Sequence, residues 1–201
     1  MSPMRIDWLY IDEFKNLQDF EIDLDEKSLT TVLIGENGTG KSNLIEALIV
    51  IFRDLHLGNR AEFEYKIRYE HSDRTIEIKS DPRSGQQRYY IREDGEVVHL
   101  KDFEENKDAF LPAHLFAYYS GPNRRIEAYF DDHLRDFYDA QRTGKSRKLR
   151  PLFLARHVHS QFVLQAFYAF PTPESERLLK HFLWITGLES VLFELKEPEW
   201  Y

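Results

Sequence analysis

The sequence predicts an α/β fold in which a glycine-rich loop joins a buried strand to a helix. Three observations carry this prediction. The letters GENGTGKS, residues 35–42, stand between a β-branched apolar run and a long apolar run. Alternation of polar and apolar residues fills residues 61–103, and apolar residues at helical spacing dominate residues 124–187. A mixed sheet, an antiparallel β meander and a helical segment should therefore follow one another along the chain.

The N-terminal third contains three predicted strands and one helix. RIDWLYI at 5–11 and DFEIDL at 19–24 alternate with period two, so they predict paired strands joined through FKNLQ at 14–18. SLTTVLIG at 28–35 is short, mostly β-branched or apolar, and ends at glycine, which predicts a buried strand. NLIEALIVIFRDL at 43–55 is apolar nearly all round, which predicts a helix buried on most sides.

The middle of the chain predicts an antiparallel meander with one face in water. Its runs are FEYKIRY, TIEIKS, QRYYIRE and EVVHL, and the Asp94-Gly95 pair should form a two-residue hairpin turn between the last two. LFAYYSG at 115–121 is again apolar and ends at glycine. We expect it to be a second buried strand of the main sheet.

Three helices are expected after the meander, at 124–142, 151–170 and 174–187. The third has the clearest boundaries, with Thr172 as N-cap, Pro173 at the first helical position and Gly187 at its end. SVLFELKE at 190–197 resembles a strand. No heptad pattern lasts long enough for a coiled coil.

Composition excludes several classes of protein. With 42% hydrophobic and 14% aromatic residues, the 201-residue chain can bury a core of one domain or one lobe of a larger domain. The net charge of -8 confines any nucleic-acid contact to a local surface. Without cysteine there is no disulfide, thiolate metal site or cysteine nucleophile. No signal-like or membrane-spanning apolar run is present, so we expect a cytoplasmic protein without a membrane partner.

GENGTGKS matches the phosphate-binding pattern G-x-x-x-x-G-K-[ST] in full. A strand before it and a helix after it would point backbone N–H groups and a helix N-terminus at a phosphate. Gly35, Gly38 and Gly40 would let the backbone wrap closely. Lys41 would bridge the β- and γ-phosphates, and the Ser42 hydroxyl would ligate magnesium. The alternative is a glycine-rich turn with a solvated lysine.

The surrounding letters resemble a known group of ATPases. I-x-x-F-K-N-L, then F-E-I-D-L, then L-I-G-E-N-G-T-G-K-S-N-L-I-E-A-L is similar to the N-terminal lobe of the heads shared by SMC, RecF and OLD proteins. The similarity is greatest to AAA ATPases of that group found beside restriction and anti-phage defence genes, whose next strand reads much like FAYYSGPNRR. It covers Arg5–Leu55 and Leu115–Arg125. The resemblance implies a P-loop NTPase with an ABC-type ATPase head lobe, using ATP and Mg²⁺.

The resemblance also extends the candidate nucleotide site to the corner after the first strand. Phe14 is a further candidate there, although a core role suits it equally. Asn37 would line the γ-phosphate. The predicted nucleotide-binding residues are Lys15, Asn16, Gly35, Asn37, Gly38, Thr39, Gly40, Lys41, Ser42 and Asn43, with Ser42 as the magnesium ligand.

No catalytic residue can be assigned. ABC-type hydrolysis needs four apolar residues followed by Asp-Glu, and no such run follows residue 42. An LSGGE-like segment and a late switch histidine are also missing, and Ser120-Gly121-Pro122 stands where the lid glutamine is expected. Residues 1–201 are therefore expected to be the N-terminal part of one P-loop ATPase domain.

As the resemblance implies, two complete heads would form a homodimer around ATP. ATP binding and hydrolysis would then be coupled to a DNA transaction or to a partner nuclease. Two alternatives remain. One is a nucleotide-binding regulatory module that does not hydrolyse ATP. The other is a P-loop small-molecule kinase, against which the antiparallel meander argues.

Three other groups of residues are candidates for a functional role. RTGKSRKLR, Arg142–Arg150, has five basic residues and could contact a nucleic-acid backbone or serve as a solvated connector. Arg124 and Arg125 follow a predicted strand at the edge where phosphates bind in α/β sheets, or form a surface pair. His157 and His159 are two apart, which does not suit a metal on a helix, so packing or hydrogen bonding is expected.

Overall fold

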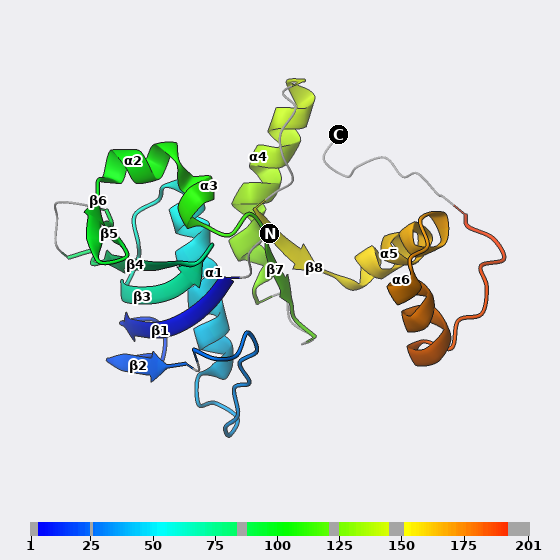
Figure 1. Cartoon of the computed structure of the whole chain (residues 1–201), viewed down its shortest axis with the longest axis horizontal. Coiled ribbons are helices and arrows are strands. Elements are labelled where there is room, and N and C mark those ends of the chain that lie inside the picture. The colour runs from blue at the N-terminus through cyan, green and yellow to red at the C-terminus, as the bar shows by residue number, and fades with distance from the viewer. Residues whose placement is uncertain (1–3, 25, 84–87, 121–124, 145–150, 193–201) are drawn as a thin grey trace. The chain divides into compact units, whose positions relative to one another are not determined.

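The protein is described by a computed structural model that covers residues 4–24, 26–83, 88–120, 125–144 and 151–192. The chain divides into two compact units, Met1–Leu154 and Ala155–Tyr201 (Figure 1). The first unit holds the predicted phosphate-binding loop and is built on one large sheet. No helix of the described residues is long and apolar enough to cross a membrane.

The large sheet has six strands in the order β2-β1-β3-β4-β5-β6, and every neighbouring pair is antiparallel. Both predicted N-terminal strands and all four meander strands are confirmed. Asp94 and Gly95 form the predicted hairpin turn, with φ of 48° and 84°. The strands are β1 Met4–Asp12, β2 Phe20–Asp23, β3 Glu64–His71, β4 Arg74–Ser80, β5 Tyr90–Glu93 and β6 Glu96–Val98.

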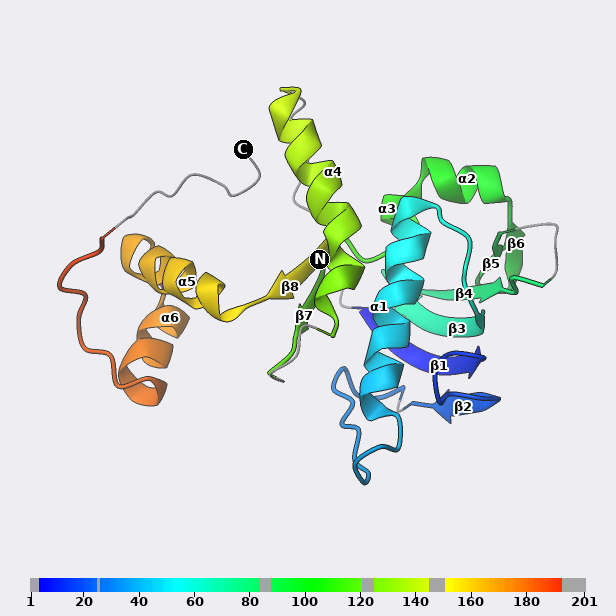
Figure 2. The ribbon, with the colours of Figure 1, turned by 180° about the vertical axis from the view of Figure 1, so that it is seen from behind.

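The helix after the loop, α1 (Lys41–Leu57), runs along one face of this sheet (Figure 2). Because side chains alternate along a strand, Leu9 and Ile11 of β1 face the helix, whereas Trp8 and Tyr10 face the opposite side. The helix is buried on most sides as predicted, although Ile45 remains 49% exposed. The core of the first unit therefore lies between α1 and one face of the sheet.

A second apolar cluster covers another side of α1. The chain passes through α2 (Leu100–Glu105) and α3 (Lys107–Phe110) to β7 (Leu115–Tyr118), which pairs with β8 (Leu152–Ala155). In the sequence, η1 (Glu127–Phe130) and α4 (Asp131–Arg142) come between β7 and β8. Buried residues from α1, β8 and the η1 region form the cluster: Ile49, Ile126, Phe130, Leu152 and Leu154.

Two predictions for the main sheet are wrong. Residues 28–35 form no strand, and Val32 and Ile34 are 71% and 91% exposed. β7 is a strand but lies in a separate two-stranded sheet, with Phe116 71% exposed, so it is not a buried strand of the main sheet. Consequently the main sheet is antiparallel and not mixed. A buried strand needs hydrogen-bonding neighbours on both sides, and β1 already uses β2 and β3.

The expected helix at 151–170 is correct only in its second part, because residues 152–155 form β8 and α5 spans His157–Ala169. Alternation in β8 buries Leu152 and Leu154 in the second cluster, and this tertiary contact favours a strand.

The last predicted helix begins as expected. The Thr172 side chain accepts a hydrogen bond from the Ser175 N–H at 3.2 Å, with Pro173 at the first helical position. α6 (Pro173–Arg177) continues as a π-helical turn, η2 (Leu178–Phe182). It ends before Trp184, which has φ of 57°, so the predicted end at Gly187 is wrong. Residues 190–192 have no regular structure, and the remainder of the strand predicted at 190–197 lies outside the described residues.

Candidate nucleotide-binding site

The loop at residues 35–40 ends in a left-handed turn that starts α1. Gly38 and Gly40 have φ of 89° and 98°, a region that side chains with a Cβ atom rarely adopt. A Cβ at Gly40 would also lie 3.0 Å from Asn16 Oδ1 and 3.2 Å from Leu17 Cδ2. Glycine is therefore required at position 40 both for its dihedral angle and for the space around it.

The side chain of Lys41 points back into the loop. Its Nζ donates hydrogen bonds to the carbonyl oxygens of Gly35 at 2.7 Å and Glu36 at 2.6 Å. The Thr39 hydroxyl also donates to the Glu36 carbonyl, at 2.9 Å. The N-cap residue of α1 is Gly40, which has no side chain to cap the helix, so the first N–H groups remain available to a ligand. The ammonium group and the helix N-terminus together favour an anion at this loop.

The turn at residues 14–17 contacts the loop at residues 35–40 and supports it. Phe14 and Leu17 exchange two backbone hydrogen bonds, of 3.1 and 2.9 Å, which close a tight turn over Lys15 and Asn16. The Asn16 Nδ2 donates to the Gly38 carbonyl at 3.2 Å, and its Oδ1 accepts a hydrogen bond from Asn43. Asn16 therefore links the turn of the loop to the first turn of α1.

Phe14 takes the core role that the sequence left open. It is 9% exposed, and its ring centroid lies 4.5 Å from that of Phe63. Of the other predicted residues, Asn37 and Ser42 are exposed, so both can reach a ligand. Ser42 lies in the first turn of α1.

A buried carboxylate that sequence reasoning missed lies one turn further along the helix. Glu46 is fully buried and forms ion pairs with Lys15 and Arg125. The Tyr129 hydroxyl donates to Glu46 Oε2 at 3.3 Å, and Arg125 also donates to Asn43 Oδ1. The sequence does contain a signal for this residue, because Glu46 is the single acid in the apolar run at 44–52. A charged side chain on a buried helix face requires partners of opposite charge.

These contacts keep the Lys15 side chain protonated. Burial lowers the pKa of its ammonium group, but hydrogen bonds to Glu46 and Tyr129 outweigh that effect and raise the pKa above its ordinary value. The ammonium also lies 5.4 Å from the Phe14 ring centroid and 5.8 Å from that of Tyr129. Lys15 is thus a permanent cation, engaged by Glu46 beside the loop.

An apolar hollow of about 690 Å³ adjoins Lys41 and Ser42. It is lined by residues from β1, β2, α1 and the segment at 28–33, including Leu9, Leu29 and Ile45. This volume lies within the usual range of small-molecule sites.

The described residues contain no group of three or more His, Asp or Glu side chains that could hold a metal ion. An exposed serine hydroxyl beside a phosphate loop does suit a magnesium ion that takes its remaining ligands from phosphates and water. The site residues therefore fit a magnesium–nucleotide pair. β7 and the two residues that follow it, Tyr119 and Ser120, contribute no acid.

The structure describes the other candidate groups only in part. Arg125 reaches α1 as described above, whereas Arg124 and residues 145–150 lie outside the described residues. His159 accepts a hydrogen bond from the Arg156 N–H at 2.9 Å, which is a capping role at the start of α5.

Comparison with known proteins agrees with this arrangement. The family model described as AAA ATPase domain matches residues 4–140. The chain is also similar to the DNA replication and repair protein RecF of two strains of Desulfitobacterium hafniense, DCB-2 and Y51. Each is 44% identical over 45 residues, which is 22% of this chain and 12% of the relative. Since the family model covers more than half of the chain, the protein belongs to the AAA ATPase domain family.

Proposed function

We propose that the chain binds Mg-ATP at residues 35–42. The observation that carries the proposal is the Lys41 ammonium, which points into the loop at the uncapped N-terminus of α1 and is held by two backbone carbonyls. Phosphate oxygens are stronger acceptors than these carbonyls, so Lys41 would exchange them for the β- and γ-phosphates. The nucleotide, when bound, would supply a phosphoanhydride bond, and its phosphate oxygens and water would complete the ligands of magnesium.

Different residues of the chain would have different roles in binding Mg-ATP. Gly35, Thr39 and the two left-handed glycines shape the loop, and Ser42 offers its hydroxyl to magnesium. Asn37 would line the γ-phosphate from the loop. Asn16 and Asn43 hold the loop against α1, and the adjoining apolar hollow has the size and character that suit a base.

We further propose that residues 1–201 are the N-terminal part of an SMC/RecF/OLD-like ATPase. In that arrangement two heads form a homodimer, and ATP binding and hydrolysis control a DNA transaction or a partner nuclease in repair or defence. The printed name of the RecF relatives supports a role with DNA. The exposed apolar residues Val32, Ile34 and Phe116 support this proposal, because further elements of a complete head could cover them.

Titration calorimetry with Mg-ATP tests the binding site. Lys41→Ala should weaken binding about 10- to 100-fold, because it removes charge-assisted hydrogen bonds worth about 1.5–3 kcal/mol. Lys101→Ala is the matched control, since Lys101 is 83% exposed and, among the described residues, forms an ion pair with Glu105 at 3.8 Å. Far-UV circular dichroism checks that both variants fold. Unchanged affinity in a folded Lys41→Ala variant contradicts the proposed site.

Turnover by the pure chain distinguishes binding from hydrolysis. We expect ATP to be bound and hydrolysed near the background rate, because the described residues place no acid at the end of β7 to activate water. Sustained hydrolysis that is lost in Lys41→Ala would show that the catalytic acid lies within this chain. Phosphate transfer to a small acceptor would favour the kinase alternative.

A further inference from the structure

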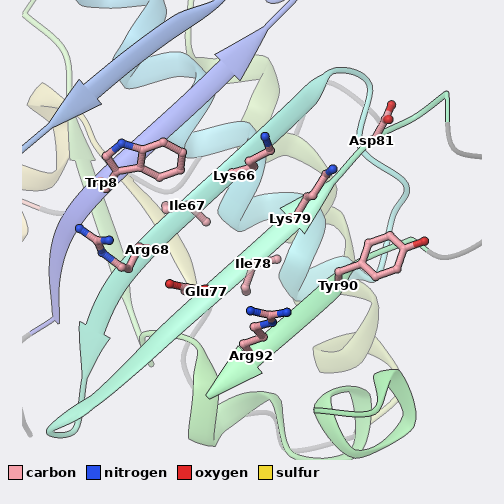
Figure 3. A pocket seen from close by; sticks show the side chains of 10 residues that line it. All are labelled: Trp8, Lys66, Ile67, Arg68, Glu77, Ile78, Lys79, Asp81, Tyr90 and Arg92. Atoms are coloured by element: carbon pink, nitrogen blue, oxygen red, sulfur yellow. The ribbon is translucent and has the colours of Figure 1, made fainter. Parts of the chain in front are cut away.

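A second candidate site lies on the side of the large sheet that faces away from α1. A hollow of about 550 Å³ spans strands β1, β3, β4 and β5. Figure 3 shows basic side chains across the three neighbouring strands β3, β4 and β5, with Trp8 at one side and Tyr90 at the other. The basic residues are Lys66, Arg68, Lys79 and Arg92.

Positive charge exceeds negative charge in this hollow, although the whole chain has a net charge of -8. The acidic residues that line it are Glu77 and Asp81. The Asp81 carboxylate already accepts hydrogen bonds from the Arg83 N–H at 2.9 Å and from Arg83 Nε at 3.3 Å, and these bonds lower its pKa. The two lining carboxylates therefore stand against four lining cations, and one of them, Asp81, also pairs with Arg83 outside the hollow.

The strand register brings like charges together. Lys66 and Lys79 are direct partners across β3 and β4, an arrangement that destabilises an antiparallel pair unless an anion is present. Arg68 pairs with Glu26 at 3.2 Å. Within the described part of the chain, no ion pair joins Lys79 or Arg92 to a carboxylate. Arg92 has Glu77 as its direct neighbour across β4 and β5, and Lys79 helps to lower the pKa of Asp81, so each cation has a nearby carboxylate but forms no close ion pair with it. Both cations can therefore turn to an external anion.

Aromatic rings lie beside the cations. The Trp8 indole N–H donates to Glu21 at 2.8 Å, which holds the ring in place at the β1 side of the hollow. Tyr90 is 43% exposed and is the direct neighbour of Lys79. Lys66 lies 4.8 Å from the ring centroid of Tyr10. Cations interleaved with accessible rings suit a ligand that has both phosphates and unpaired bases.

We propose that this face of the sheet, defined by Trp8, Lys66, Arg68, Lys79, Tyr90 and Arg92, binds single-stranded nucleic acid. The cations contact phosphates, and Trp8 and Tyr90 stack on bases. An acidic peptide would use the cations but leave the rings unused, and a duplex would hide its bases from them. This surface is separate from the phosphate-binding loop, so the inference goes beyond the proposed ATP site.

Fluorescence anisotropy with labelled oligo(dT) and oligo(U) tests the proposal on the 201-residue chain at several salt concentrations. The test variant carries Lys66→Gln, Lys79→Gln and Arg92→Gln. Its matched control carries Lys101→Gln, Arg177→Gln and Lys180→Gln, which remove the same charge from exposed positions elsewhere. The two probes distinguish DNA from RNA.

The test variant should bind at least about tenfold more weakly at low salt. It should also reduce the slope of log affinity against log salt by about 2, because each phosphate contact with a single strand contributes about 0.7. Tyr90→Leu keeps the strand apolar and should weaken binding about fivefold without changing the slope, because stacking is not ionic. Thermal unfolding checks that each variant is folded.

Several outcomes overturn the proposal: unchanged affinity of the folded test variant, an equal loss in the control, or loss only when the basic residues of 142–150 are replaced. Competition by poly-glutamate as strong as by oligo(dT) would also overturn it in favour of an acidic protein partner. Lys41→Ala should keep nucleic-acid binding, and the test variant should keep ATP binding. A negative result for one of the two binding sites therefore does not contradict the other.

Discussion

Glu46 should stabilise the protein when its cations are present and destabilise it when they are removed. Its carboxylate is fully buried, whereas the side chains of Lys15 and Arg125 are 37% and 36% exposed. Glu46→Gln keeps the shape of the side chain and a hydrogen-bond acceptor for Tyr129. The two cations can then turn to water, so the expected cost is about 1–2 kcal/mol.

The double variant Lys15→Ala, Arg125→Ala should cost more, because it leaves a buried carboxylate without a cation. Removing the partners of a buried charge costs about 3–5 kcal/mol. Adding Glu46→Gln to this double variant should regain about 1–2 kcal/mol, since a neutral amide is cheaper to bury than an unpaired carboxylate. Glu46→Gln should therefore lower the free energy of unfolding of the unmodified protein and raise that of the double variant.

Urea unfolding followed by far-UV circular dichroism measures the four free energies of unfolding. Glu46→Gln alone should move the midpoint to lower urea, and Glu46→Gln in the double variant should move it to higher urea. If Glu46→Gln destabilised both backgrounds equally, the carboxylate would not be paired with these cations and the reasoning would fail.

Two further predictions concern the loop glycine and a buried histidine. Gly40→Ala and Gly38→Ala both place alanine at positive φ, at a cost of about 1–2 kcal/mol, but only the Gly40 Cβ would meet Asn16. Gly40→Ala should therefore lose more stability and more ATP affinity, and equal effects in unfolding and calorimetry would contradict the geometry. Burial, with the nearby charges of His133 and Lys107, lowers the pKa of His56 to about 4. The unfolded chain binds this proton at its usual pKa of about 6.5, so stability should fall by up to about 3 kcal/mol as pH drops from about 6.5 to 4. His56→Gln should flatten that pH dependence of the unfolding midpoint, and an unchanged profile would argue against a neutral buried histidine.

Local patterns predicted much of the fold. Alternation located all six strands of the large sheet, and the Asp94-Gly95 pair located its hairpin turn. Apolar periodicity located α1, and capping residues located the start of α6. These features depend on neighbours within a few residues, which is the range that a single sequence displays.

Apolar runs without a periodic pattern were the source of the errors. Residues 28–35 and 151–155 are both apolar, yet the first has no strand and the second forms β8. Whether such a run pairs depends on a free strand edge, which is a property of the assembled sheet.

By itself, the sequence determined the position of the glycine-rich loop, the helix that follows it and the antiparallel strands. Only the tertiary structure showed that Asn16 braces the loop and that Glu46 joins Lys15 to Arg125. It also placed Trp8 and Tyr90 on the same face as four cations. The physical reason is that these contacts join residues far apart in the chain, and a favourable electrostatic or stacking energy depends on their distance in space.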